Sequence, residues 1–332
     1  MGLISPLGAL EIEEQRHYPG AAQGRELRIL STADIVVFHP LIEAFQERNP
    51  QLSIHYVVAG STDVFGALQD EPARFDLAIS SAMDLQMKLA NDGFAQAHRS
   101  AQARALPPWA HWRDQLYAFT QESVVLILSE AALQGAPKPK TRQDLIQLLR
   151  EHSERFRGRI GTYDPHRSGA GYLFATQDAR QSETFWRLAE VMGGLAPRFF
   201  GTSAAMISGL LNGDILIAYN VLGSYAAPRL AAHPDMHLIE LEDFTLTLLR
   251  TALIPRAAQN PDLGSAFLDF LLSAQGRRII GERTSLPPLD EEALAAQPHL
   301  RPIRLDPGLL VYVDPLKRRK FLNELDAALI RP

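Results

Sequence analysis

The chain has 332 residues and no cysteine, which excludes disulfide bonds, thiol catalysis and cysteine-bound metals. No apolar run approaches the ~18 residues of a transmembrane helix. The net charge of −5 argues against a nucleic-acid partner, because duplex binding needs a basic face. The ten histidines are scattered without metal-ligand spacing, so we predict no metal site.

Enzyme motifs are missing as well. No Gly-Lys pair occurs, so there is no P-loop, and the segment 169–174 imitates a dinucleotide fingerprint but lacks its third glycine. Ser168 lies in Arg-Ser-Gly-Ala-Gly, which is not a nucleophile elbow. We therefore predict no catalytic residue and no cofactor. The 46% hydrophobic and 21% charged residues are ordinary for a globular protein, and the length suffices for two domains.

The most informative segment runs from residue 159 to residue 177, where an apolar strand, a small polar turn and a helix follow one another. A helix N-terminus has unpaired N–H groups and a partial positive charge, so such a turn can hold an anion. Ser168 would supply a hydroxyl, while Gly169, Ala170 and Gly171 would leave room for close approach. The alternative is a plain turn with a serine cap.

The same pattern recurs at four other strand ends. Each apolar run is followed by small polar residues and then by a helical pattern, and the candidate ligand-binding residues at these ends are Thr32, Asp34, Ser61, Thr62, Ser80, Ser81, Tyr219 and Asn220. Ligands in open α/β sheets bind outside the carboxyl ends of the strands. The pattern therefore predicts a polar small-molecule cleft. Helix capping is the alternative for the hydroxyl residues, and Asp34 could either accept hydrogen bonds from sugar hydroxyls or cap a helix.

Strand-like runs alternate with helical periods, which predicts an α/β fold with mostly parallel sheets. We expect residues 1–25 to form a tail, residues 26–117 and 250–332 one lobe, and residues 121–246 the other. Hinge crossings are expected near 118–122 and 244–250. No signal peptide is visible between Met1 and Leu10, because a basic start and a long enough apolar stretch are missing.

Several segments resemble the family 1 extracellular solute-binding proteins, over about residues 26 to 325. The segments that carry the resemblance are 75–86, 161–164 with 168–173, 218–225 and 308–312 with 316–322. The branch they resemble is the ferric-binding-protein-like group, which includes hexose-phosphate binders and the phosphoglycerate-transport regulatory binding protein.

This resemblance implies a type II periplasmic binding fold, with two α/β lobes, two hinge strands and closure around one solute. It also implies delivery of that solute to an ABC permease or its presentation to a membrane sensor kinase. Such proteins are exported, so we expect a periplasmic monomer whose signal peptide has been removed. Arg167, Glu122 and Asp243 stay open as ligand contacts, with solvent, hinge or surface roles as their alternatives.

Ferric members of the group carry two adjacent tyrosines that supply phenolate ligands. In this chain the matching positions are Tyr219 and Asn220, and the next tyrosine is Tyr225. Losing the adjacent pair weakens an iron function, and the hydroxyl-rich turns suit an organic anion such as a sugar phosphate or a phosphoglycerate. A ferric-ion binder and an intracellular enzyme or regulator with a bilobal fold stay as alternatives.

Overall fold

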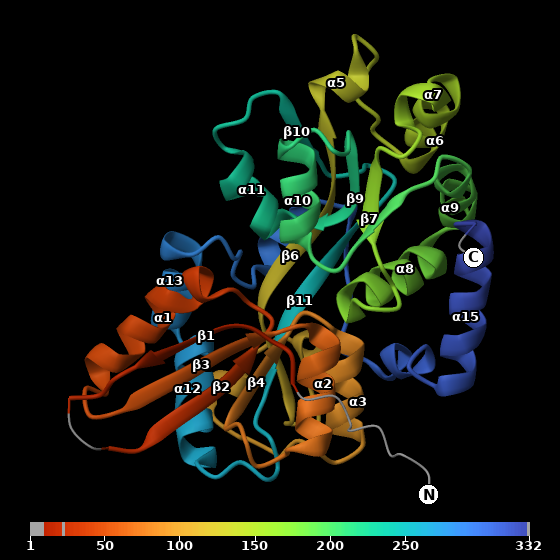
Figure 1. Ribbon diagram of the computed structural model, residues 1–332. Helices are drawn as coiled ribbons and strands as arrows, with labels where there is room; N and C mark the ends of the chain where they lie inside the picture. The colour runs from red at the N-terminus through yellow and green to blue at the C-terminus, as the bar shows by residue number, and fades with distance from the viewer. Residues whose placement is uncertain (1–9, 22–23, 331–332) are drawn as a thin grey trace, which may run out of the picture. The chain divides into compact units, whose positions relative to one another are not determined.

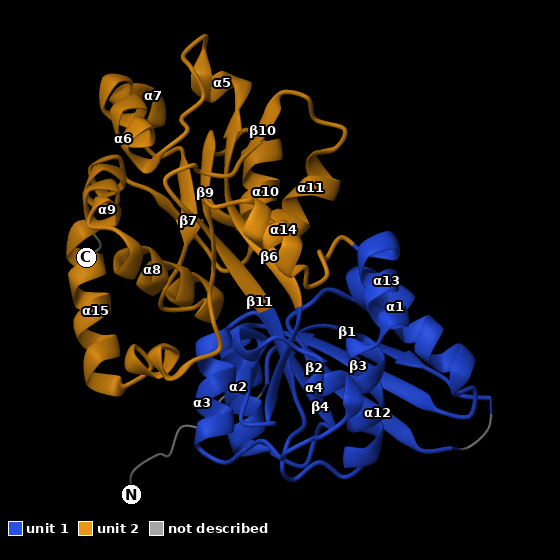
Figure 2. Cartoon of the chain, turned by 180° about the vertical axis from the view of Figure 1, so that it is seen from behind, with its two compact units in different colours: residues 1–119, 250–284 blue, residues 120–249, 285–332 orange. Residues whose placement is uncertain are grey.

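The computed structural model describes residues 10–21 and 24–330. The chain forms two compact units, one of residues 1–119 with 250–284 and one of residues 120–249 with 285–332 (Figure 2). We call them unit 1 and unit 2. Strands β6 (Leu116–Ser129) and β11 (Thr245–Leu253) each run from one unit into the other. Two of the chain's crossings therefore lie in long strands, close to the expected hinge positions.

Unit 1 is built on a sheet in the order β1-β3-β2-β4-β11 (Figure 1). Its parallel centre is β3-β2-β4, while β1 and β11 pair antiparallel at its two sides. Helices α1, α12 and α13 pack together, and α2 packs against α3. The elements wholly within this unit are β1 Ile12–Tyr18, β2 Glu26–Ser31, α1 Ile35–Arg48, β3 Ser53–Ala59, α2 Ser61–Asp70, β4 Leu77–Ser80, α3 Met83–Asn91, α4 Ala101–Arg104, the 3₁₀ helix η1 Pro108–Ala110, β5 His111–Trp112, α12 Pro261–Leu272 and α13 Ala274–Arg283.

Unit 2 is built on strands in the order β6-β9-β7-β8, with β10 on β6 and β12 on β11. Strand β7 pairs parallel with β8 and β9, whereas β6 pairs antiparallel with β9. Helix α9 packs against α6, α8 and α15. The elements wholly within this unit are α5 Glu130–Leu133, α6 Arg142–Glu151, α7 Ser153–Phe156, β7 Ile160–Tyr163, α8 Gly169–Gln181, α9 Thr184–Gly194, β8 Arg198–Phe200, α10 Ser203–Leu211, β9 Ile217–Leu222, α11 Gly223–Leu230, β10 Met236–Ile239, α14 Glu291–Ala296, β12 Leu300–Pro302, the 3₁₀ helix η2 Pro307–Val311 and α15 Pro315–Ala328.

Two expected boundaries differ from the structure. The predicted N-terminal tail contains β1, whose residues pair in register with β3 from Ile12 opposite Ala59 to Tyr18 opposite Ile54. Residues 1–9 and 22–23 of that tail lie outside the described residues. The segment 285–332, expected in the first lobe, belongs to unit 2, so the chain changes units a third time between Thr284 and Ser285. Apolar packing explains the placement of this segment in unit 2, because Phe321 and Leu322 of α15 belong to the buried core of that unit.

The sheets place the strand ends that the sequence singled out. In unit 1, three parallel neighbours, β2, β3 and β4, each lead directly into a helix, so three helix N-termini follow three adjacent carboxyl ends.

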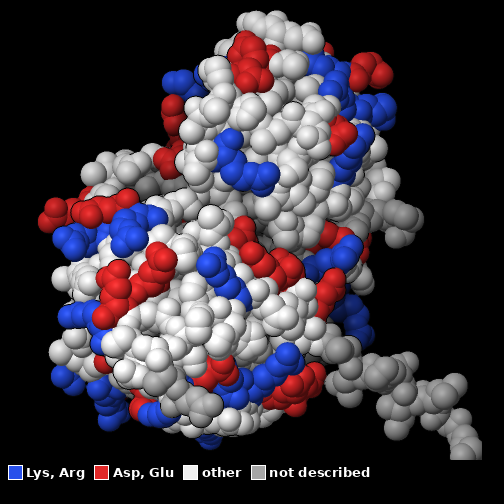
Figure 3. Space-filling view, turned by 60° about the vertical axis from the view of Figure 1, so that its left-hand side comes forward, with Lys and Arg blue, Asp and Glu red and all other residues white. Residues whose placement is uncertain are grey.

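None of the described helices has both the length and the apolar character needed to cross a membrane. On the face shown in Figure 3, basic and acidic side chains are interspersed, with no broad basic area.

Candidate functional site

The turn after β7 forms the first part of the candidate site, and we call residues 168–171 the α8 cradle. Ser168 is the N-cap of α8, and its hydroxyl accepts a hydrogen bond from the Gly171 N–H at 3.1 Å. The Ala170 N–H finds no acceptor within the described residues. The first turn of α8 carries no acidic residue. A helix N-terminus whose first turn has no acidic residue favours a bound anion.

Gly171 has a packing role that its sequence position did not reveal. A Cβ atom there would lie only 2.4 Å from Cβ of Tyr163, a distance that real side chains essentially never show, and 3.2 Å from Cβ of Ser168. The glycine therefore lets α8 approach β7 closely, and this accounts for the residue without a ligand. Substituting Gly171 would disturb folding, so it cannot serve as a clean probe of binding.

Tyr219 and Asn220 lie inside strand β9, which continues to Leu222, so their predicted place at a strand end is wrong. A buried network holds both side chains. The Tyr219 hydroxyl donates to Oδ2 of Asp178 at 2.8 Å and accepts from Nε of Arg142 at 2.9 Å. The Asn220 Nδ2 donates to the same Asp178 oxygen at 2.8 Å. Tyr219 and Asp178 are 2% and 0% exposed, respectively. The structure thus places the Tyr219 phenol in the core, with its hydroxyl used by core partners.

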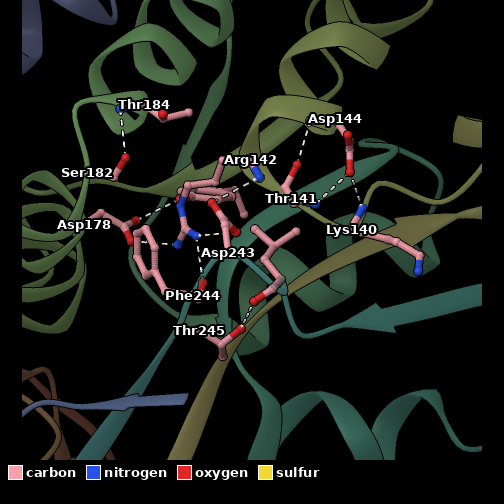
Figure 4. Close-up of polar contacts among 12 residues, drawn as sticks. Lys140, Thr141, Arg142, Asp144, Asp178, Ser182, Thr184, Asp243, Phe244 and Thr245 are labelled. Carbon is pink, nitrogen blue, oxygen red and sulfur yellow. Dashed lines mark hydrogen bonds and ion pairs between the residues drawn. The ribbon is translucent and has the colours of Figure 1, made fainter. Parts of the chain in front are cut away.

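Arg142 is the centre of this network (Figure 4). Its guanidinium also donates to Oδ1 of Asp178 at 2.9 Å, to Oδ1 of Asp243 at 3.2 Å and to the Phe244 carbonyl at 2.7 Å, and it stacks on the Phe244 ring at 3.5 Å. Burial alone would lower the pKa of Arg142, but Tyr219 and the two carboxylates raise it, so the cation persists. The sequence left open whether Asp243 contacts a ligand. In the structure its side chain pairs with Arg142.

The network determines the state of Tyr219 and the orientation of Asn220. Burial raises the pKa of Tyr219 well above its ordinary value, so the phenol keeps its proton. A carboxylate only accepts hydrogen bonds, so the Asn220 amide must turn its NH₂ toward Asp178 and leave Oδ1 as the outward group. No donor among the described residues reaches this oxygen. Asn220 also has φ +65°, a left-handed conformation that asparagine tolerates better than most residues.

In unit 1, the structure brings together two of the predicted residues from different turns. Oγ1 of Thr32 accepts from the Ser81 N–H at 3.1 Å and donates to Oγ of Ser81 at 3.4 Å. Ser80 uses its hydroxyl locally, accepting from the Ala82 N–H at 3.1 Å. Ser61 and Thr62 are half-buried in the first turn of α2. We call Thr32, Ser81 and the residues at the starts of α1 and α2 the unit 1 rim.

Arg250 is a residue of this rim that the sequence reasoning missed. Its side chain is 0% exposed, and Nη1 donates to Oγ1 of Thr32 at 3.3 Å. The sequence did contain a signal for this residue, because Arg250 is the only charged residue among the nine residues of β11. The buried guanidinium places a positive charge beside the hydroxyl groups of Thr32 and Ser81.

The outer part of the unit 1 rim is acidic. Oε2 of Glu14 accepts from the Ile35 N–H at 3.4 Å at the start of α1, and Asp63 lies over Gly60 at the start of α2. Burial, followed by the charges of Asp34, Asp63 and Glu11, raises the pKa of Glu13. Asp34 therefore lies among carboxylates, which suits it to accept hydrogen bonds from hydroxyl groups rather than to help bind an anion.

Two other candidates from the sequence have structural surroundings of their own. Glu122 is 0% exposed and accepts hydrogen bonds from the hydroxyls of Thr120, at 3.0 Å, and Ser224. Arg167 is exposed in the turn before α8. Among the described residues, no group of three or more histidine, aspartate or glutamate side chains is arranged to hold a metal ion.

Comparisons with known proteins agree with this architecture. A model of the bacterial extracellular solute-binding proteins matches residues 27–283. The substrate-binding protein of an ABC transporter from Agrobacterium tumefaciens is 33% identical, with 97% of this chain and 100% of that chain covered and a TM-score of 0.92. A sequence search of curated proteins gave no match.

More distant solved structures share the fold. AfuA from Actinobacillus pleuropneumoniae, with fructose-6-phosphate bound, is 17% identical over 93% of this chain and 99% of that chain, with a TM-score of 0.73. Iron-bound HitA from Pseudomonas aeruginosa is 16% identical over 92% of this chain and 99% of that chain, with a TM-score of 0.69. These likenesses confirm the periplasmic binding protein fold that the sequence resemblance implied.

Proposed function

Because the chain belongs to the bacterial extracellular solute-binding proteins, which serve ABC transporters, we propose that it captures a small organic anion, such as a sugar phosphate or a phosphoglycerate. One observation carries this proposal. The α8 cradle combines a serine cap, an amide N–H without an acceptor in the described chain and a first turn without a carboxylate. Each of these features favours a phosphate or carboxylate group at this helix N-terminus.

The hydrogen-bonding groups around the cradle suit a solute that also carries hydroxyl groups. Asn220 presents its carbonyl oxygen, since its NH₂ is held by Asp178. A carbonyl oxygen accepts a hydrogen bond from a hydroxyl and repels a phosphate oxygen, so we assign Asn220 to the polyol part of the ligand. The fructose-6-phosphate bound to AfuA is a compound of this class, although that likeness concerns the fold.

Binding by such a protein involves no covalent step, so we propose no catalytic activity. The partners are then the solute and the membrane permease of an ABC importer, with a membrane sensor kinase as the alternative receiver. We propose that the protein acts as a periplasmic monomer. We include Thr32 and Ser81, whose hydroxyl groups lie together in unit 1, among the ligand-binding residues.

Ferric-ion binding is the competing function, and iron-bound HitA shares the fold. The protonated, buried phenol of Tyr219 argues against it, because a phenolate ligand would have to leave Asp178 and Arg142 and lose its proton. Adding Fe(III) should therefore produce no tyrosinate charge-transfer band in the visible spectrum.

A thermal-shift panel of sugar phosphates, phosphoglycerates and dicarboxylates tests the proposal. A true ligand at about 100 times its dissociation constant should stabilise the protein by roughly 2.7 kcal/mol. Ser168→Ala should lose most of that shift. Ser182→Ala is the matched control, because Ser182 accepts from the Thr184 N–H at the start of α9 at the same 3.1 Å. No shift with any member of the panel would count against an organic anion.

A further inference from the structure

A second pocket in unit 2 lies at the other end of α8, away from the α8 cradle. Its volume is about 310 Å³, and it is lined by the last residues of α8 and by the segment from β12 to η2. Helix α8 has 13 residues, so its two ends are separated by roughly 18 Å along its axis. None of the residues that line this pocket belongs to the candidate site described above.

Three arginines converge on this pocket without carboxylate partners. Nη1 of Arg180 has one hydrogen bond, to Oε1 of Gln177 at 3.4 Å, and Arg301 donates to the backbone carbonyls of Pro298 and Leu300. The Arg304 side chain makes no hydrogen bond or ion pair within residues 10–21 and 24–330. The pocket therefore gathers three cations in one small volume.

Asp306 is the single carboxylate among the lining residues, and it accepts a hydrogen bond from the backbone of η2. Oδ1 of Asp306 accepts from the Gly308 N–H at 2.7 Å and caps η2, and no ion pair joins it to a lining arginine in the described chain. Three guanidinium groups against one carboxylate leave an excess of two positive charges. Like charges held together without neutralisation repel one another, which a multiply charged anion would relieve.

The fold holds the arginines where they are. Arg301 lies in β12, which pairs parallel with β11, and the Ile303 N–H donates to the Thr247 carbonyl at 2.9 Å. Ile303 is 4% exposed, so the segment that bears Arg301 and Arg304 is anchored from inside. A Cβ atom at Gly308 would lie 3.3 Å from Nη2 of Arg180, so this glycine leaves room for the guanidinium.

We propose that this pocket, which we call the arginine pocket, binds a small phosphate-bearing polyanion. Planar guanidinium groups pair with phosphate oxygens through two parallel hydrogen bonds, and Gln177 and Gln181 add amide donors. The volume lies at the lower end of the range of about 300–1,000 Å³ typical of small-molecule sites. The three arginines are solvent-exposed, so binding depends on salt concentration.

Calorimetric titration with inorganic pyrophosphate at low salt tests the site. We expect R301Q/R304Q to bind pyrophosphate at least about tenfold more weakly, since two charge-assisted contacts are lost. Arg150→Gln is the matched control, because Arg150 is an exposed arginine of α6 that makes no ion pair in the described part of unit 2. This control should bind like the wild type, and all the variants should unfold at the wild-type temperature.

The same titration in a Ser168→Ala background separates this pocket from the α8 cradle. Pyrophosphate binding that persists in Ser168→Ala and disappears on adding R301Q/R304Q supports the arginine pocket. Unchanged binding by R301Q/R304Q, or binding that only Ser168→Ala removes, overturns it.

A phosphate group can come from a free metabolite or from a lipid headgroup, and vesicles distinguish the two. Co-sedimentation with phosphatidic acid vesicles, lost in R301Q/R304Q and absent with phosphatidylcholine, identifies a lipid source. Binding of soluble pyrophosphate without vesicle binding identifies a free phosphate compound. Vesicle binding that R301Q/R304Q leaves unchanged contradicts the proposal.

Discussion

The helix N-termini of the two units differ in what covers them. In unit 1, carboxylates lie at all three helices that follow the parallel strands, with Glu14 at α1, Asp63 at α2 and Asp84 at α3. In unit 2, the first turn of α8 has no acidic residue, and a serine hydroxyl caps it. The same strand–turn–helix geometry thus carries carboxylates at the helix starts of unit 1 and none in the first turn of α8, which makes α8 the better place for an anion.

This difference shows that backbone geometry alone does not make an anion site. The sequence pattern treated all five strand ends alike, because each has hydroxyl groups and small residues. The acidic residues that distinguish them come partly from β1, a strand that the sequence analysis took for a tail. In unit 1, the positive group is instead a side chain, Arg250.

The largest expected effect comes from breaking the network that holds Asn220. Asp178→Ala leaves Arg142 buried without its main partner, so the free energy of unfolding should fall by about 3–5 kcal/mol. Asp243→Ala should cost much less, because the Asp243 side chain is 26% exposed and water can replace it. Urea denaturation of the two variants checks the order, and equal losses would show that Asp178 is not the central anion.

Ser168→Ala should separate binding from stability. We expect affinity for the phosphorylated solute to fall at least about tenfold, because a hydroxyl donor and the shape of the cradle are lost. The free energy of unfolding should fall by only about 1 kcal/mol, the usual cost of removing a cap. Gly171→Ala should behave in the opposite way and mainly destabilise the fold, since its methyl group meets Tyr163. Calorimetric titration and thermal unfolding of both variants measure the contrast.

Asn220→Gly removes one acceptor while keeping the left-handed backbone. The affinity of this variant for the solute should fall about three- to tenfold, which corresponds to the loss of one hydrogen bond. Its affinity for an analogue of the solute without the hydroxyl group should equal that of the wild type. Gln134→Gly is the control for backbone freedom, since Gln134 has φ +47° at the end of α5. If the analogue loses as much affinity as the full solute, Asn220 does not bind a hydroxyl group.

The smallest effect concerns the acidic rim of unit 1. A raised carboxyl pKa means that folded Glu13 binds its proton more tightly than the unfolded chain does. Its contribution to the free energy of unfolding therefore falls as pH rises from its ordinary value of 4.5 through the raised one. Glu13→Gln should be slightly more stable than the wild type at neutral pH and converge with it in acid. Thermal unfolding across pH, with Glu154→Gln as an exposed control, detects this.

Much of the fold was readable from the sequence. The apolar runs predicted the strand–helix alternation, and the serine cap considered at Ser168 is confirmed. These features depend on residues close together in the chain. The antiparallel strand β1 and the placement of residues 285–332 in unit 2 depend on distant pairing, which no local pattern encodes.

The candidate site was predictable to a smaller extent. Its strand ends follow from periodicity, but the link from Arg142 through Asp178 to Asn220 joins residues 36 and 42 positions apart. Asp178 is the only acidic residue of α8, but no neighbouring residue in the chain identifies Arg142 as its partner. The sequence could therefore suggest Asn220 without showing which of its amide atoms faces outward, and that atom decides between a hydroxyl and an anion.

Paired titrations of phosphate esters and their dephosphorylated counterparts test the central claim most directly. We predict that at least one sugar phosphate or phosphoglycerate binds, and that its uncharged counterpart binds at least about 100-fold more weakly, as expected for several lost charge-assisted hydrogen bonds. Equal affinity for the neutral compound, or binding of Fe(III) with no binding of any ester, would contradict the assignment of the α8 cradle as an anion site.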